Sequence, residues 1–441
     1  MATDLRHRTT TTSPINHVDA NYKNPSVSST PRPPLQSRVT NHPAGEVKHG
    51  LPSQILRAVV SLGWFLISCV CIHITQWLGA PLYYWDKSYF YAWMALSKQS
   101  FAIITIMLTQ CFSPTTIRLS GDSSMRGQFS KAKDGSGLLE TRFPERMVLI
   151  SNHQIYTDWI YLWYTAYASR MHGAIYIILK ESLKYIPLIG WGMQFNGFVF
   201  MSRKWDTDKP RLQHRMRQLS TKHAVKVAGT GGIVKTDASS GLDPMWMIIF
   251  PEGTNYSANT KKKSVAWSEK SGIPDMRHQL LPRATGMFFC LNELKETVEY
   301  VYDCTVAYEG SPKTGYAQDY FSLRSTFLQG RPPKSVNFYW RRFAIKDLPL
   351  DDQKAFEKWI LNCWREKDDL LETFYNTGRF PADQDSQAEP YVESPVKLRS
   401  LAELLQPYVV VITAALLLNI GRMLWTRFIS RLWIALRPGA E

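Results

Sequence analysis

The side chains of His153 and Asp158, five positions apart, could together perform general-base chemistry. Five residues of a regular helix turn through about 500°, so the pair would point apart if both were mid-helix. The two can meet if His153 lies on a turn and Asp158 lies in the first helical turn, where the helix dipole also favours a carboxylate. Asp158 would then hold one imidazole nitrogen and leave the other basic. With no obvious serine or cysteine nucleophile, the pair suits attack by a substrate hydroxyl on an acyl group.

The neighbouring segments predict where this pair lies. Met147–Ile150 is an apolar run typical of a short buried strand, and Ile160–Tyr164 is typical of an apolar helix. His153 and Asp158 therefore occupy a strand-to-helix junction, where side chains are free to do chemistry. A histidine that caps a helix, with an aspartate in the first turn, would give the same spacing. The pair alone leaves that structural alternative open.

Three further segments follow the pair in a fixed order: Lys180–Gly190, Gly197–Arg203 and Phe250–Thr254. Together with Asn152–Asp158, they resemble the motif blocks of the glycerophospholipid acyltransferase superfamily, which includes the 1-acylglycerol-3-phosphate acyltransferases. Four more features resemble one branch of it, the lysocardiolipin and lysophosphatidylinositol acyltransferase-like group: Gln154, Trp159, Leu280–Gly286 and Tyr302–Tyr308.

The resemblance implies an acyl-CoA-dependent O-acyltransferase that acylates a lysophospholipid, with lysophosphatidylinositol-type acceptors favoured. His153 would take the proton of the acceptor hydroxyl and Asp158 would orient it. Acyl-CoA is then a co-substrate, and no metal or other cofactor is expected. The alternatives are a lysophosphatidate acyltransferase that makes phosphatidic acid, an inactive membrane scaffold with the same fold, and a hydrolase that uses water as the acceptor.

The resemblance also implies substrate-binding roles for five residues. Arg203 follows an apolar strand and can bind a phosphate with two parallel hydrogen bonds; the weaker alternative is a pair with a surface carboxylate. Lys180 would contribute to phosphate binding, or be a solvated lysine at a strand end. Gly253 permits a tight turn whose backbone groups are candidate donors to the oxyanion. Glu252 would pair with Arg203 or bind a glycerol hydroxyl, and Thr254 can donate its hydroxyl.

Composition limits the partners. The chain has 441 residues, of which 44% are hydrophobic, and its formal net charge is +15. A basic protein has acidic partners such as nucleic acid, anionic lipid or phosphorylated ligands. The sequence has no nucleic-acid-binding motif, and apolar segments flank its middle. We therefore expect membrane lipids and phosphorylated substrates as partners, and no nucleic acid.

Strands and helices alternate through the middle of the chain, which indicates an α/β fold with a mixed sheet flanked by helices. We place the catalytic domain at residues 114–382. A charged helix is expected over Arg211–Val227 and a long polar loop over Asn255–Gln279. The expected strands are Thr116–Leu119, Met147–Ile150, Ala174–Leu179, Phe198–Met201, Met245–Phe250, Val301–Ala307 and Val336–Trp340.

Apolar segments at both ends of the chain predict attachment to a membrane. Ile55–Tyr84 is long enough to span a bilayer. Tyr89–Phe112 is interrupted by Lys98 and Gln99, so this second helix would lie in the interface or pack on the first. Basic residues before the first helix favour a catalytic domain that faces the cytosol, and we expect the membrane to be the endoplasmic reticulum. The remaining divisions are a disordered tail at residues 1–54, membrane helices at 55–113, a linker at 383–400 and, at 401–441, a membrane anchor followed by a basic interfacial helix.

Overall fold

A computed structural model describes most of the chain. Residues 1–41, the greater part of the expected disordered tail, lie outside the described residues. The rest of that expected tail is described and packs on the folded domain, where His42 Nε2 lies 2.9 Å from the Tyr320 carbonyl oxygen. The described ranges are 42–223, 225–227, 233–235, 241–383 and 390–436.

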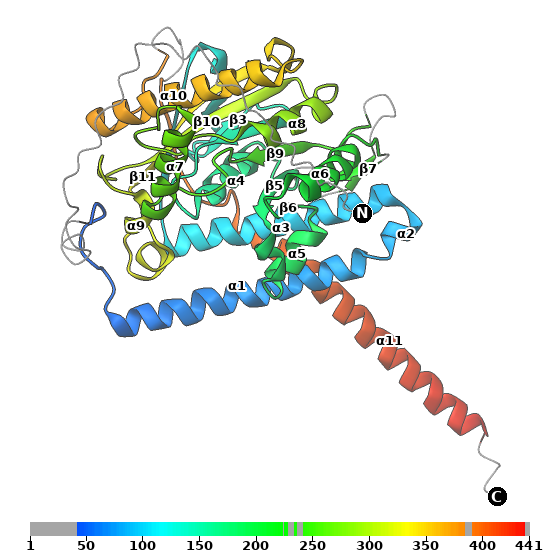
Figure 1. Cartoon of the computed structure of the whole chain (residues 1–441). Helices are drawn as coiled ribbons and strands as arrows, with labels where there is room; N and C mark the ends of the chain where they lie inside the picture. The colour runs from blue at the N-terminus through cyan, green and yellow to red at the C-terminus, as the bar shows by residue number, and fades with distance from the viewer. Residues whose placement is uncertain (1–41, 224, 228–232, 236–240, 384–389, 437–441) are drawn as a thin grey trace, which may run out of the picture.

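An eight-stranded mixed sheet forms the centre of the described structure (Figure 1), and all seven expected strands are confirmed as members of it. Strands β10, β4, β9, β5 and β6 are parallel to one another, whereas β11 and β1 run the other way. The order across the sheet is β12 (Val392–Pro395), β1 (Thr116–Gly121), β11 (Ser335–Ala344), β10 (Tyr300–Tyr308), β4 (Arg146–Ser151), β9 (Met245–Ile249), β5 (Ile175–Lys180) and β6 (Val199–Met201).

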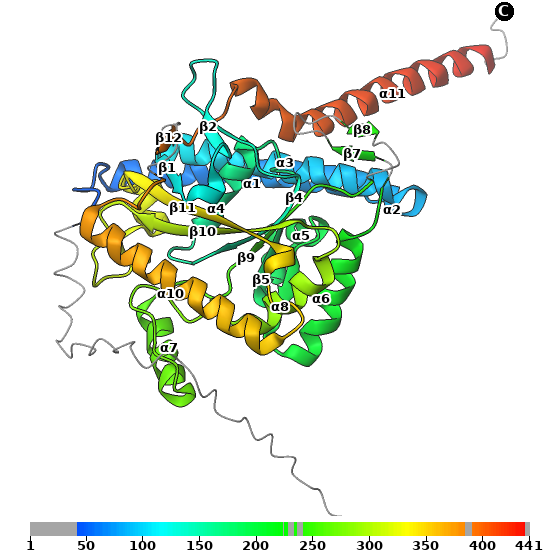
Figure 2. The same ribbon diagram turned by 90° about the horizontal axis from the view of Figure 1, so that it is seen from above.

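Helices cover both faces of the sheet, which explains why the central strands are continuously apolar. Met147 and Leu149 of β4 face one side, together with helices α3 (Lys87–Phe112) and α4 (Asp158–Ala168). Val148 and Ile150 face the other side, together with α6 (Trp205–Leu219), α8 (Ala284–Leu294) and α10 (Gln353–Thr377). Figures 1 and 2 show these layers. The smaller elements are β2 (Phe129–Lys131), β3 (Leu139–Thr141), α5 (Ile189–Phe195), β7 (Val225–Val227), β8 (Ile233–Lys235) and α9 (Ala317–Tyr320).

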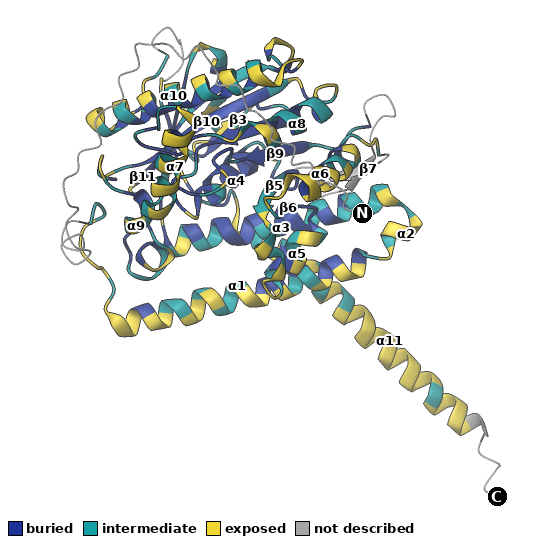
Figure 3. Ribbon diagram, in the orientation of Figure 1, coloured by how far each residue is buried: buried dark blue, intermediate teal, exposed yellow. Residues whose placement is uncertain are grey.

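Three helices of the described chain are long and apolar enough to cross a membrane. The first includes α1 (Leu51–Gly79) and the short α2 (Leu82–Trp85), the second is α3, and the third ends with α11 (Gln406–Leu436). In the most apolar 18-residue stretch of α3, 67% of the residues are buried inside the protein. The buried share of the corresponding stretch is 17% in the first helix and 6% in the last. Figure 3 shows the exposed surfaces of α1 and α11. The second apolar helix is therefore a layer of the α/β domain as well as a partner of α1.

Several boundaries differ from the expected ones. Residues 392–395, inside the expected linker, form strand β12, which pairs antiparallel with β1. Its alternate residues Val392 and Ser394 are buried, as in a strand with one face against the core. The expected polar loop at 255–279 contains helix α7 (Ala258–Ser271), which a capping box between Ser257 and Thr260 begins. The charged helix ends at Leu219, so its expected extension to Val227 is wrong. The expected anchor and interfacial helix at 401–441 begin with a short 3-10 helix, Leu401–Leu405, and continue as one unbroken helix, α11, from Gln406 to Leu436.

Helix α1 packs on α3 through a glycine. Trp93 of α3 donates a 2.7 Å hydrogen bond to the carbonyl of Thr75, and its indole occupies the space where a side chain at Gly79 would stand. We expect Gly79→Ala to destabilise the fold by about 1–3 kcal/mol, because the added methyl group must displace Trp93. Thermal unfolding of the purified chain in detergent measures the effect.

Gly63→Ala is the matched control on the same helix, since nothing lies within 4 Å of a Cβ at that position. Its melting temperature should equal or slightly exceed that of the wild type, because alanine is the better helix former. Equal melting temperatures for the two variants would contradict the packing described for Gly79.

Candidate active site

Neighbouring parallel strands end on the same side of the sheet, and each is followed by one of the residues singled out in the sequence. His153 follows β4, Glu252 follows β9, Lys180 is the last residue of β5, and Arg203 follows β6. Ligands of α/β proteins bind outside the carboxyl ends of their strands. The fold thus gathers four of the expected site residues along one edge.

His153 and Asp158 are in direct contact. His153 Nδ1 lies 2.7 Å from Asp158 Oδ2, and helix α4 begins at Asp158, so the expected geometry of a turn followed by a first helical turn is confirmed. The Asp158 side chain is completely buried, whereas that of His153 is 19% exposed. The contact uses Nδ1, so Nε2 is the ring nitrogen that remains to accept a proton.

The buried carboxylate of Asp158 accepts further hydrogen bonds that hold it in place. The backbone N–H groups of Gln154 and Ile155 donate to its Oδ2 over 2.6 Å and 3.1 Å. The hydroxyl of Tyr308, a completely buried residue of β10, donates to its Oδ1. These donors offset the cost of burying a charge. Sequence reasoning noticed the segment that contains Tyr308 but gave this residue no role, because its contact spans 150 positions of the chain.

Other contacts fix the loop that carries His153. The side-chain amide of Asn152 donates to the Val306 carbonyl at 3.0 Å and accepts from the Val306 N–H at 2.8 Å, which clamps the end of β4 to β10. The Phe250 ring stacks on the imidazole with a centroid separation of 4.4 Å. The N–H of Tyr256 donates to the His153 carbonyl at 2.7 Å. The imidazole therefore has little freedom to turn away from Asp158.

Glu252 lies behind His153. Its Oε1 accepts the backbone N–H of His153 at 3.1 Å, and the residue is only 2% exposed. Burial raises the pKa of the Glu252 carboxyl well above its ordinary range. The two partners expected for this carboxyl were Arg203 and a glycerol hydroxyl. In the described structure it supports the backbone of the histidine loop, and it makes no hydrogen bond or ion pair with Arg203.

Arg203 reaches the same loop from the other side. Its Nη2 donates a 2.8 Å hydrogen bond to the carbonyl of Gly253, next in the chain to Glu252. Arg203 has a φ of +69° and Gly253 a φ of +70°. The left-handed conformation of Arg203 is held by Asp208, which accepts its backbone N–H at 2.8 Å. The exposed guanidinium therefore contacts the loop after β9, and the same loop contacts the backbone of His153 through Glu252.

The remaining expected residues lie nearby without a contact to the histidine. Lys180 is exposed at the end of β5, and Thr254 is half-buried in the loop after β9. The Gly253 N–H, considered as a donor to an oxyanion, already donates to the Phe250 carbonyl at 2.9 Å. In the part of the chain that the structure describes, no group of three or more His, Cys, Asp and Glu side chains could hold a metal ion.

Comparisons with known proteins find similarity to acyltransferases. A family model described as acyltransferase matches residues 138–309, and one described as acyltransferase C-terminus matches residues 326–406. An uncharacterised acyltransferase of Schizosaccharomyces pombe is 34% identical over 347 residues, covering 79% of this chain and 91% of that protein. A 2-acyl-1-lysophosphatidylinositol acyltransferase of Saccharomyces cerevisiae is 34% identical over 343 residues, with coverages of 74% and 86%. A lysocardiolipin acyltransferase of Gallus gallus is 32% identical over 238 residues, with coverages of 53% and 55%.

The raised pKa of Glu252 makes stability depend on pH. The unfolded chain releases this proton near the ordinary glutamate pKa of about 4.3, whereas the folded protein keeps it to higher pH. Folding takes up a proton between those two values, so stability falls as the pH rises through that window. Glu252→Gln removes this uptake. Its melting temperature minus that of the wild type should therefore increase from about pH 5 to about pH 8.

Glu181→Gln is the control for this measurement. Hydrogen bonds from Lys184 and Arg211 lower the pKa of the half-buried Glu181, so its titration lies below the tested range. The corresponding difference in melting temperature should be constant with pH. A constant or falling difference for Glu252→Gln would show that its carboxyl is ionised in the folded protein.

Proposed function

This chain belongs to the glycerophospholipid acyltransferase superfamily, and we propose that it transfers an acyl group from acyl-CoA to the free hydroxyl of a lysophospholipid, with lysophosphatidylinositol-type acceptors favoured. The observation that carries the proposed mechanism is the 2.7 Å contact between His153 and the buried Asp158 at the carboxyl end of β4. A histidine held in this way can serve as a general base.

In the proposed reaction, Nε2 of His153 removes the proton from the acceptor hydroxyl. The hydroxyl oxygen then attacks the thioester carbonyl, an ester C–O bond forms and the C–S bond breaks. His153 returns its proton to the departing sulfur, so that CoA leaves as a thiol. Asp158 fixes the tautomer before proton transfer and stabilises the imidazolium afterwards, since its own position is held by Gln154, Ile155 and Tyr308.

Two exposed cations suit the phosphate of the acceptor. Arg203 donates one N–H to the Gly253 carbonyl, and its other N–H groups can donate hydrogen bonds to phosphate oxygens beside the histidine loop. Lys180 ends the neighbouring strand β5 and adds a second positive charge at the same edge. The names of two relatives refer to lysophosphatidylinositol and lysocardiolipin, which supports a phosphate-bearing lysolipid as the acceptor.

The apolar helices suggest association with a membrane, where both the lysolipid and the acyl chain of acyl-CoA are concentrated. We assign this membrane to the endoplasmic reticulum, with the catalytic domain in the cytosol. The assignment of the side rests on the basic residues that precede α1 in the sequence.

His153→Ala should lower kcat for acyl transfer by about 10²- to 10⁴-fold, the usual contribution of a general base. The measurement is CoA release from an acyl-CoA with a lysolipid acceptor. His214→Ala is the matched control, because His214 is exposed on α6 and its ring bonds only to Gln218 among the described residues. Unchanged transfer by a folded, membrane-bound His153→Ala protein would refute the mechanism and favour an inactive scaffold.

Tyr308→Phe should lower kcat roughly tenfold to a hundredfold without a matching rise in KM for the lysolipid. Its hydroxyl holds Asp158 rather than the substrate, and loss of one donor leaves a buried carboxylate oxygen unsatisfied. Tyr161→Phe is the control, since Tyr161 is equally buried and its ring centroid lies 6.1 Å from that of Tyr308. If both variants lost the same fraction of activity, general destabilisation would explain the result.

A panel of lysolipids with one acyl-CoA tests the acceptor. We expect kcat/KM for lysophosphatidylinositol to exceed that for lysophosphatidate, and CoA release to require an acceptor. A preference for lysophosphatidate would instead assign the chain to phosphatidic acid synthesis. CoA release at full rate without any lysolipid would identify a hydrolase.

A further inference from the structure

A sizeable cavity in the described structure lies away from the histidine loop. It has a volume of about 860 Å³ and is bordered by α1, α2, α3, α5 and α6 and by the first residues of β4, β5 and β9. Arg146 and Met245, which start β4 and β9, line it, whereas His153 and Glu252 follow the opposite ends of those strands. The length of β4, about 17 Å at the usual rise per residue, separates the two sites. We call this space the α3 cavity.

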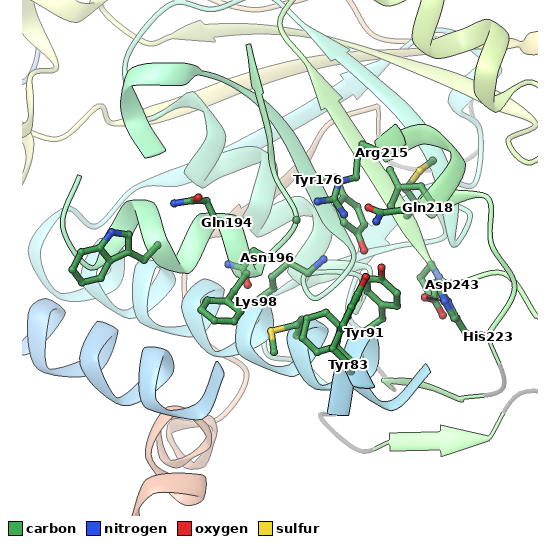
Figure 4. A pocket seen from close by; sticks show the side chains of 18 of the residues that line it. Tyr83, Tyr91, Lys98, Tyr176, Gln194, Asn196, Arg215, Gln218, His223 and Asp243 are labelled. Atoms are coloured by element: carbon green, nitrogen blue, oxygen red, sulfur yellow. Dashed lines mark hydrogen bonds and ion pairs between the residues drawn. The ribbon is translucent and has the colours of Figure 1, made fainter. Parts of the chain in front are cut away.

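A buried lysine reaches the α3 cavity from α3 (Figure 4). Lys98 is only 2% exposed, and its Nζ lies 3.7 Å from the centroid of the Tyr176 ring. Its hydrogen bond to the Ile175 carbonyl is long, at 3.4 Å. Among the described residues, no carboxylate forms an ion pair with it. An ammonium group buried in this way calls for an anion.

A second cation faces the same space from α6. Arg215 lines the cavity, and its guanidinium lies over Gly197, where a Cβ would stand 2.9 Å from Nη1. Gly197 has no side chain, which leaves the room that this guanidinium occupies, and its φ of +73° also favours glycine. Figure 4 shows Arg215 and Lys98 entering the cavity from different helices.

The other charged groups of the lining are already engaged. Asp243, the carboxylate of the lining, is 2.7 Å from Nδ1 of His223. The Arg146 guanidinium donates to the carbonyls of Thr297 and Leu219 over 2.9 Å and 3.0 Å. Lys98 and Arg215 therefore remain as the cations of the cavity that are available to a ligand.

The rest of the lining is aromatic and opens beside the apolar helices. Trp77 of α1 is 61% exposed and Trp191 of α5 is 51% exposed, while Tyr91 lies deeper. Exposed tryptophans beside an apolar helix are typical of the zone where a membrane meets water. A volume of this size, mostly apolar with a few convergent polar groups, is typical of a small-molecule site.

We propose that the α3 cavity binds a single-chain lipid with an anionic head group, taken up from the membrane that α1 contacts. A carboxylate or phosphate head lies between Lys98 and Arg215, and the chain lies along Trp77, Tyr91 and Trp191. This site is separate from the one that transfers the acyl group. Its occupant neutralises the two cations between α3 and α6 and so stabilises the docking of α3 on the sheet.

Photolabelling of the full-length protein in detergent tests the proposal. The probe is an oleate analogue that carries a diazirine on its chain, and the labelled peptides are mapped by mass spectrometry. We expect labels on residues of the α3 cavity. Oleate and oleoyl lysophosphatidate should compete with the probe, whereas uncharged monooleoylglycerol and inorganic phosphate should compete at least about tenfold less well.

Arg215→Met should weaken labelling of the cavity about tenfold to a hundredfold, the usual effect of losing one charged hydrogen bond. Arg217→Met is the matched control, because Arg217 is exposed on the same helix and is absent from the lining. It should label like the wild type, and both variants should retain acyl transfer.

Four results would overturn the proposal. Equal labelling of the Arg215→Met and Arg217→Met proteins would show that Arg215 does not bind the anionic head group. Labels confined to the histidine loop would show that the α3 cavity is not a second lipid site. Competition by inorganic phosphate equal to that by oleate would show that the acyl chain of the lipid contributes nothing to binding. A loss of acyl transfer in a stable Arg215→Met protein would show that the cavity belongs to the catalytic site.

Discussion

A carboxylate with no exposed surface is the constraint on which the rest of the candidate active site depends. Asp158 begins helix α4 beneath the sheet edge, where an ionised group is costly unless it is fully hydrogen-bonded. Its partners come from the histidine loop and from β10, so the carboxylate ties together two strands and a helix. The same contacts that make the burial tolerable also set the orientation of His153. Stability and chemistry are therefore linked at one residue.

Parallel strands explain why residues far apart in the sequence lie together. The strands β4, β9, β5 and β6 are neighbours and run in the same direction, so the loops after them share one edge. The turn at Gly253 joins the two halves of the site, since its carbonyl accepts from Arg203 while the preceding Glu252 accepts from the backbone of His153. A shift of the loop after β9 would therefore move His153 and Arg203 together.

Helix α3 connects the catalytic domain to the membrane-facing part of the molecule. One side of it supplies Ala102, Ile103 and Ile106 to the core beneath the sheet, and another packs on α1. The polar interruption at Lys98, which would be costly in a bilayer, lies on the wall of a cavity. Burial of this helix inside the protein lets Lys98 lie on that wall, away from the loop that carries His153.

The sequence by itself determined the local elements and the type of chemistry. Apolar runs predicted the seven strands, because a strand buried on both faces needs apolar residues at every position. The spacing of His153 and Asp158 was sufficient to predict their contact, since only five residues separate them. The tertiary structure alone decided what depends on distant segments: the hydroxyl of Tyr308 on Asp158, the place of Glu252 behind the histidine, the strand at Val392–Pro395 and the position of Lys98 and Arg215 on the wall of one cavity. Such contacts arise when the sheet forms and brings together chain segments that are 99 or more positions apart, and no local pattern records them.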